Sequence, residues 1–135
     1  MDVSIRAMFD WRRPGNLGVT NGRLAPCRRS PNCVSSQADP IDKEHYIAPL
    51  EFRGSMQSLR AALAELPLAT IVVAEGDYLY AEFRTPILRF VDDVEFLKAG
   101  DVLQVRSASR LGRRDFKANR HRVEQLRALI SSLPP

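Results

Sequence analysis

Two cysteines lie in a short segment whose composition favours turns over helix or strand. Cys27 and Cys33 flank Ser30-Pro31-Asn32, which can turn the chain back on itself. The pair could form a disulfide, bind a metal together with His45, or supply a thiolate nucleophile activated by neighbouring arginines. Two reduced cysteines with a structural role fit the residues equally well. We expect no metal, because a structural zinc site takes about four protein ligands and a convincing fourth ligand is missing.

Charged side chains also fall inside two predicted strands, where charge costs stability unless it is paired or used. Asp93 and Glu95 lie in one of these strands, and Arg106 and Arg110 lie in the next. Because side chains alternate across a strand, these charges share one side of the predicted sheet. We call this side the polar face. Its expected members are Tyr78, Tyr80, Glu82, Asp93, Glu95, Gln104, Arg106 and Arg110.

Two states of the polar face are consistent with the residues. The face is either solvated, with cross-strand charge pairs that contribute about 0.2–1 kcal/mol each, or covered by the N-terminal residues to form a semi-enclosed pocket. In the covered state, side chains around the two cysteines would contribute to the site. These are Cys27, Ser30, Asn32, Cys33, Ser35 and Ser36.

The preferred function is a non-catalytic domain that binds a small polar or anionic ligand on the polar face. Arg106 and Arg110 would donate to the anion, Asp93 and Glu95 would orient them, and the tyrosines would form walls. The enzymatic alternative is a hydrolase that uses Asp93 and Glu95 as acid and base, or Cys33 as nucleophile. No histidine with a carboxylate orienter at short range supports it. We expect no cofactor.

Periodicity predicts the elements that hold these groups. Before about Asp42 the chain shows turn residues and no regular pattern, so we expect residues 1–42 to form an irregular arm packed on a single domain whose sheet and helices span 43–135. A strand over 45–53 precedes a helix that begins at the N-cap Ser55 and is stopped by Pro67. The following elements are strands over 68–74, 78–84, 90–97 and 102–110, and a helix from an N-cap at Asp115.

This order predicts an α+β fold: a curved antiparallel sheet of about five strands (strand, helix, four strands, helix), with both helices on one face. A four-residue turn over 98–101 would set Leu97 opposite Val102 and Asp93 opposite Arg106. Asp92 points to the helix side by strand parity, so we assign it a structural role with a charged or capping partner.

Bulk composition agrees with one globular domain. The chain has 135 residues, of which 44% are hydrophobic and 27% charged, close to the average for soluble proteins. No apolar run approaches the roughly 20 residues that span a bilayer, so no transmembrane segment is expected. The first residues lack the pattern of a secretory signal. As written, the chain is expected in the cytoplasm, or in the periplasm or at a membrane if a leader has been removed.

Positive charge is concentrated at the C-terminal end. Residues 100–135 carry 8 basic and 3 acidic side chains, and the helix predicted there could hold phosphates or serve a protein-interaction module. Apart from Phe116, no aromatic residue is interleaved with these arginines, which disfavours nucleic acid as a partner. The sequence makes no prediction of oligomeric state.

Longer stretches extend the cysteine and strand patterns over nearly the whole chain. They are Asn16-Leu17-Gly18, Leu24-Ala25-Pro26-Cys27, Ser30-Pro31-Asn32-Cys33-Val34-Ser35-Ser36-Gln37, Phe90-Val91-Asp92-Asp93-Val94-Glu95-Phe96, Arg106-Ser107-Ala108-Ser109-Arg110 and Asn119-Arg120-His121-Arg122-Val123-Glu124. Together they resemble the signature blocks of domain-of-unknown-function family 1499. That family has no assigned activity, so the resemblance implies none. Many of its members look exported or membrane-tethered, in bacteria and plastids. Arg113-Arg114 stands where related sequences tend to have an uncharged pair.

Overall fold

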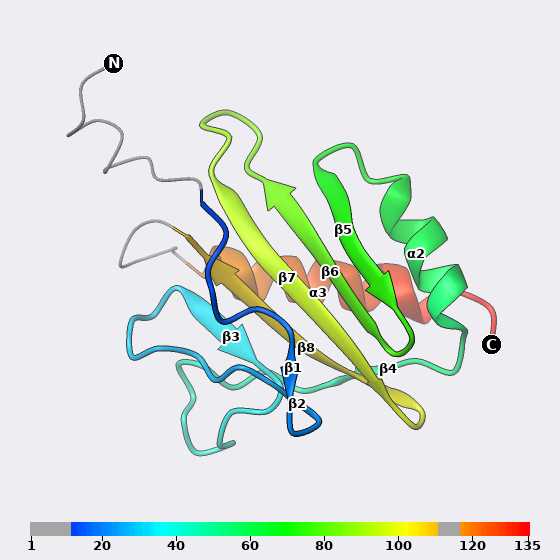
Figure 1. Ribbon diagram of the computed structural model, residues 1–135, viewed down its shortest axis with the longest axis horizontal. Helices are drawn as coiled ribbons and strands as arrows, with labels where there is room; N and C mark the ends of the chain where they lie inside the picture. The colour runs from blue at the N-terminus through cyan, green and yellow to red at the C-terminus, as the bar shows by residue number, and fades with distance from the viewer. Residues whose placement is uncertain (1–11, 111–116) are drawn as a thin grey trace.

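An antiparallel sheet forms the centre of the molecule (Figure 1). The computed structural model describes residues 12–110 and 117–135. Within them the sheet contains β3 (Cys33–Ser35), β4 (Leu50–Glu51), β5 (Ala69–Glu75), β6 (Tyr78–Arg84), β7 (Val91–Ala99) and β8 (Val102–Ser109). The strands run in the order β3-β8-β7-β6-β5, and β4 pairs with the other end of β8. With two helices beside this sheet, the predicted α+β class is confirmed.

The long strands follow the sequence pattern closely. The bounds of β6 agree with the prediction because Leu79, Ala81 and Phe83 alternate with polar and aromatic neighbours. Its connection to β5 is a tight turn in which Gly76 adopts a φ of 54°, a conformation that glycine accepts without strain. β7 continues two residues beyond the predicted end, to Ala99.

The predicted register of β7 and β8 is wrong by two residues. Ala99 pairs with Val102, so the turn has two residues, Gly100 and Asp101, in place of the expected four. Gly100 has a φ of 63°, which permits this tight reversal. An even shift preserves which side chains share a face but changes their partners. Arg106 therefore lies opposite Glu95, and not opposite Asp93.

Both helices pack on one side of the sheet. Helix α2 (Met56–Ala64) begins at the predicted N-cap, where the Ser55 hydroxyl accepts a 3.1 Å hydrogen bond from the Ser58 amide. Helix α3 (Ala118–Ser131) passes behind the sheet in Figure 1. The N-cap of α3 is Lys117, and not the predicted Asp115, which lies outside the described residues. One apolar core joins the helices to the strands and includes Leu59, Leu63, Leu79, Ala81, Phe83, Val94, Phe96, Leu103, Val105, Val123, Leu126 and Ile130.

The strand predicted over 45–53 is mostly absent. Only Leu50 and Glu51 form strand β4, with one isolated parallel bridge from Tyr46 to Ser35. Pro49 lacks the amide hydrogen that a ladder needs. Side chains from α3 bind this segment instead: the Arg127 guanidinium donates to the carbonyls of Ala48 and Pro49 at 2.8 and 2.9 Å.

The arm is more regular than predicted. Strands β1 (Val19–Thr20) and β2 (Arg23–Leu24) form a small hairpin, and β3 joins the main sheet beside β8. Strands of two or three residues are too short for periodicity to reveal. The described part of the arm crosses the side of the sheet opposite α3 (Figure 1). No helix among the described residues is long and apolar enough to cross a bilayer.

Candidate functional site

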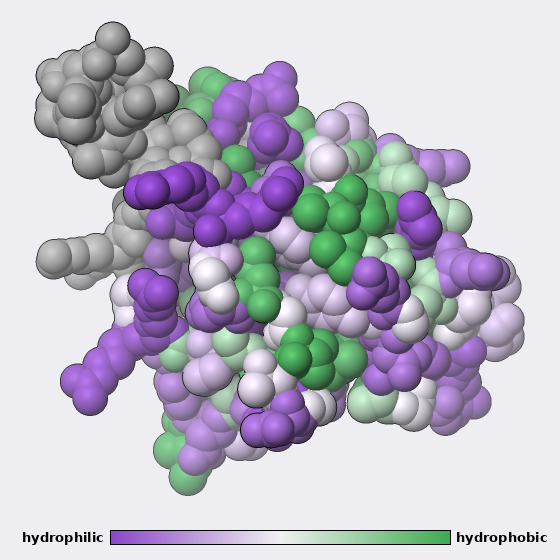
Figure 2. Space-filling model, viewed as in Figure 1, coloured by the Kyte–Doolittle hydropathy of each residue, from purple (hydrophilic) through white to green (hydrophobic). Residues whose placement is uncertain are grey.

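The polar face lies under the arm and is largely buried. Asp93 and Glu95 are only 1% and 0% exposed. Contacts from the described part of the arm reach acidic side chains on this face. The Arg13 guanidinium donates to Glu82 at 2.8 Å, and the Gly18 amide donates to Glu95 at 2.8 Å. The described part of the arm therefore contacts and helps to bury the polar face. The surface above it mixes hydrophilic and hydrophobic residues (Figure 2).

Arg110 is the centre of one half of this face. Its guanidinium binds Asp93 through two hydrogen bonds of 2.9 and 2.8 Å, and it contacts Glu82 at 2.5 Å. The Tyr80 hydroxyl donates to Asp93 and accepts from Arg110 at 3.1 Å. Burial alone would lower the pKa of Arg110, but the bonds to Asp93 and Glu82 raise it.

Glu82 and the tyrosines remain in fixed charge states in this network. Burial alone would raise the pKa of Glu82, yet hydrogen bonds from Arg13 and Arg110 hold it below its ordinary value. Burial and the neighbouring carboxylate raise the pKa of Tyr80. The pKa of Tyr78 is raised for the same reasons, by burial and by the neighbouring carboxylate of Glu95. The tyrosines therefore act as neutral hydrogen-bond donors.

Glu95 and Arg106 form the other half. Glu95 accepts from the Tyr78 hydroxyl at 2.6 Å and from the arm, whereas its contact with the Arg106 Nη1 is 3.5 Å long. The Arg106 side chain is 5% exposed, and burial lowers its pKa despite the attraction of Glu95 and Asp93. Among the described residues, Arg106 Nε and Asn16 Oδ1 are buried atoms without a hydrogen-bond partner.

The two cysteines form a disulfide. Cys27 and Cys33 have a Cα–Cα separation of 5.7 Å, so the bond ties the arm to β3, where Cys33 pairs with Ala108. Of the alternatives that the sequence left open, the disulfide is the one present. In this state Cys33 has no thiolate.

His45 lies close to the disulfide segment and is held from both ring nitrogens. Nδ1 is 2.7 Å from the Asp42 carboxylate and Nε2 is 2.9 Å from the Ser30 carbonyl. Burial alone would lower the pKa of His45, but these two acceptors raise it. Across residues 12–110 and 117–135, no three His, Cys, Asp or Glu side chains are grouped as metal ligands would be.

The remaining arm residues of the candidate site join β3 to β8. The Ser36 hydroxyl donates to Gln104 at 2.7 Å and accepts from the Val105 amide at 2.8 Å. The Asn32 carbonyl accepts from the Ser109 amide at 2.9 Å. Ser35 lies opposite Arg106 in the β3–β8 ladder. These side chains position the polar face rather than project freely from it.

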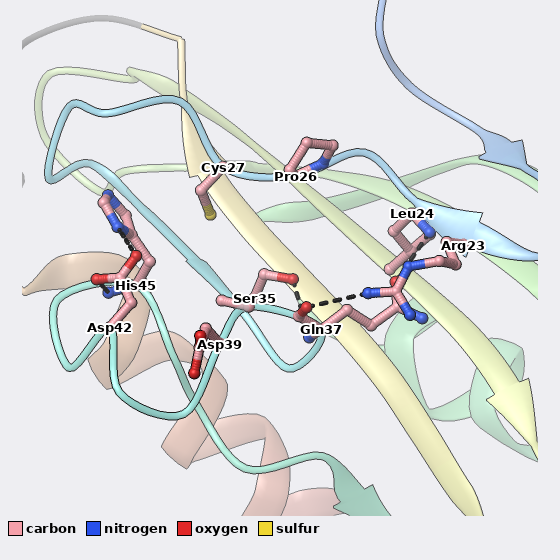
Figure 3. Close-up of a pocket in the computed structure, with 10 residues that line it drawn as sticks. Arg23, Leu24, Pro26, Cys27, Ser35, Gln37, Asp39, Asp42 and His45 are labelled. Carbon is pink, nitrogen blue, oxygen red and sulfur yellow. Dashed lines mark hydrogen bonds and ion pairs between the residues drawn. The ribbon is translucent and has the colours of Figure 1, made fainter.

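A cavity of about 350 Å³ lies beside this ladder, between residues 23–27 and the 37–45 loop (Figure 3). Ser35 lines it, next to the position of Arg106 in the ladder. Among its lining residues, the Arg23 guanidinium donates to the Gln37 carbonyl at 3.1 Å. Its lining consists of Arg23, Leu24, Pro26, Cys27, Ser35, Gln37, Ala38, Asp39, Asp42 and His45.

On the helix side, Asp92 has the partner that strand parity predicted. The Arg122 guanidinium binds it at 2.6 Å. Asn119 is fully buried beside this pair, accepts from the Ser107 hydroxyl at 2.6 Å and donates to the Asn32 carbonyl at 3.1 Å. Sequence reasoning assigned no role to Asn119. The signal that could have identified it is its position as a polar residue on the buried stripe of an amphipathic helix.

A family model described as a protein of unknown function, DUF1499, matches residues 23–130. The chain belongs to the DUF1499 family. The match includes both cysteines and runs from β2 almost to the end of α3. Neither a curated protein nor a solved structure matches the chain.

In this DUF1499 chain both carboxylate oxygens of Asp93 and both of Glu95 already have donors. Asp93 receives hydrogen bonds from Tyr80 and Arg110, and Glu95 receives them from Tyr78, Gly18 and Arg106. Such an arrangement stabilises charge and holds side chains in place. The incompletely bonded group is the Arg106 guanidinium. Arg13 and Gly18, which cover the face, were not among the predicted site residues, and they lie before the matched segment.

Proposed function

We propose that this domain binds a small polar or anionic ligand where the arm crosses the sheet, and that Arg106 anchors it. One observation carries the proposal. Arg106 is a buried cation whose Nε has no partner among the described residues and whose bond to Glu95 is long. A guanidinium has five N–H donors, and leaving buried donors unused costs free energy.

The surroundings of Arg106 favour acceptor oxygens in the ligand. Arg28 lies close enough to lower the pKa of Arg106 by repulsion, so a second cation is near. Asn16 Oδ1 is a second buried polar atom of the arm without a hydrogen-bond partner among the described residues, and it could accept from a hydroxyl or amine of a ligand. Ser35, which lies opposite Arg106 in the β3–β8 ladder, lines a cavity of about 350 Å³. This volume is within the roughly 300–1,000 Å³ range of small-molecule sites. A small hydroxy-carboxylate has the required combination of groups.

Thermal unfolding with a panel of anions tests the proposal. We would measure the Tm at constant ionic strength with phosphate, sulfate, acetate, lactate or citrate. A ligand at about 100 times its Kd adds about 2.7 kcal/mol to the free energy of unfolding, or on the order of 10 °C for a domain of this size. We expect at least one anion to give a saturable rise of this kind.

Two variants separate specific binding from general charge effects. Arg106→Gln removes the proposed anchor, and Arg60→Gln removes the same charge from an exposed position on α2. The ligand-dependent rise in Tm is expected to disappear in Arg106→Gln and to persist in Arg60→Gln. If no anion raises the Tm, or if both variants respond alike, the proposal is wrong.

A further inference from the structure

A second concave region lies on the helix side, away from the arm. It is an apolar groove of about 600 Å³ between α3, the α2–β5 connection and the end of β6. The α2–β5 connection and the β6–β7 loop lie at the same end of the sheet (Figure 1), because Ala69 pairs with Phe83. Its apolar lining comprises Leu66, Pro67, Leu68, Ala69, Phe83, Pro86, Ala118, Leu126 and Leu129.

The ionisable side chains that line the groove are all basic. Arg84, His121 and Arg122 line it, and no carboxylate does so among the described residues. Arg122 is neutralised by Asp92 at 2.6 Å and lies over the Phe83 ring, 5.5 Å from its centroid. In the part of the chain that the structure describes, the half-buried Arg84 guanidinium has no hydrogen bond or ion pair.

Apolar surface continues from the groove along the β6–β7 loop. Pro86 belongs to the lining, and the next two residues, Ile87 and Leu88, are 89% and 65% exposed. Exposed large apolar side chains beside an apolar groove mark interaction sites more often than plain surface.

We infer that the groove binds an amphiphilic anion with a single aliphatic chain, of the fatty-acid class. The chain would lie along Leu66, Leu126 and Leu129, and the carboxylate would pair with Arg84. The volume is within the roughly 300–1,000 Å³ range of ligand sites, and an apolar lining with a few polar anchors is typical of them. Charge complementarity selects the anionic headgroup, because the lining offers cations and no acid.

Titration with dodecanoate below its micelle concentration tests this inference. We would follow the backbone amides of residues 66, 68, 69 and 118–129 by ¹H–¹⁵N NMR and the stoichiometry by calorimetry. One dodecanoate is expected per chain, with shifts centred on these residues. Because each buried methylene adds to the affinity, decanoate should bind on the order of tenfold more weakly. Dodecanol, which lacks the charge, should also bind more weakly than dodecanoate.

Matched variants test the headgroup. Arg84→Gln should weaken dodecanoate at least tenfold and leave dodecanol unchanged, whereas Arg60→Gln should change neither. Because Arg84 has no side-chain partner among the described residues, its variant should fold, which far-UV circular dichroism would verify. The inference is overturned if dodecanoate fails to bind, if Arg84→Gln binds it as tightly, or if the shifts fall on the arm cavity. It is equally overturned if anionic phospholipid vesicles bind and free dodecanoate does not.

Discussion

Removal of the Arg110 guanidinium should be the most damaging single change on the polar face. Its side chain is 5% exposed and donates hydrogen bonds to Asp93, Glu82 and the Tyr80 hydroxyl. Arg110→Met keeps the apolar stem but leaves buried carboxylates without their main cation. Breaking a buried pair from one side costs about 3–5 kcal/mol, so the Tm should fall by roughly 12 °C or more in a domain of this size.

Comparison with Arg106 sharpens this expectation. Arg106→Met should cost less, about 1–2 kcal/mol, because the contact is 3.5 Å long and Glu95 keeps its donors from Tyr78 and Gly18. Asp93→Asn alone should also be costly. In the double variant that combines Asp93→Asn with Arg110→Met, the free energy of unfolding should fall by less than the sum of the two single losses. The difference should be about 1–3 kcal/mol, since both substitutions break the same contact.

Urea unfolding followed by far-UV circular dichroism would give these free energies. Arg60→Met, on the exposed side of α2, serves as a control and should stay within about 0.5 kcal/mol of the wild type. A loss below about 1 kcal/mol for Arg110→Met would refute the reasoning, as would additive effects in the double variant. Either result would mean that the network is solvated in solution.

Other predictions concern the cap, the disulfide and pH. Ser55→Ala should lower the free energy of unfolding by about 1 kcal/mol, measured by urea unfolding, because it removes the N-cap of α2. Thiol titration should find no free thiol until Cys27 and Cys33 are reduced, and reduction should cost about 2 kcal/mol for so short a loop; two free thiols without reductant would contradict the disulfide. The pKa of His45 is raised, so its stabilisation is complete below its unfolded value of about 6.5 and is lost as pH rises through the folded value. Unfolding of wild type and His45→Gln between about pH 5.5 and 9 should therefore show a difference that shrinks as pH rises, and a constant difference would rule this out.

Strand parity was sufficient to assign faces, but it could not assign partners. The alternation in β6 and the charges in β7 and β8 placed the polar groups on one side, and the structure agrees. Which arginine meets which carboxylate depends on the turn between β7 and β8. The residues of 98–101 allow either a two-residue or a four-residue turn, and a two-residue shift leaves every face unchanged. Asp93 consequently meets Arg110, and Glu95 meets Arg106.

The arm could not be predicted in detail, because tertiary contacts determine its structure. Strand β3 has three residues and forms because the exposed edge of β8 accepts it. The cover of Glu95 by the Gly18 amide is a backbone contact, which the side-chain pattern cannot signal. The N-cap of α2 and the apolar stripes of both helices were predictable because they depend on neighbours in sequence. Ser55 shows this, whereas Asn119 gained its partners from β8 and the arm.

Two separate segments share one edge of β8. Strand β3 pairs with residues 106–108, β4 pairs with residues 102 and 103, and Ser36 satisfies both backbone groups of Val105 between them. A fully paired edge cannot accept a strand from another molecule. This edge is therefore protected against intermolecular strand addition, the first step of sheet-based aggregation. Deletion of the chain up to Ser36 would uncover most of it, and truncated forms should associate through β8 at concentrations where the full chain does not.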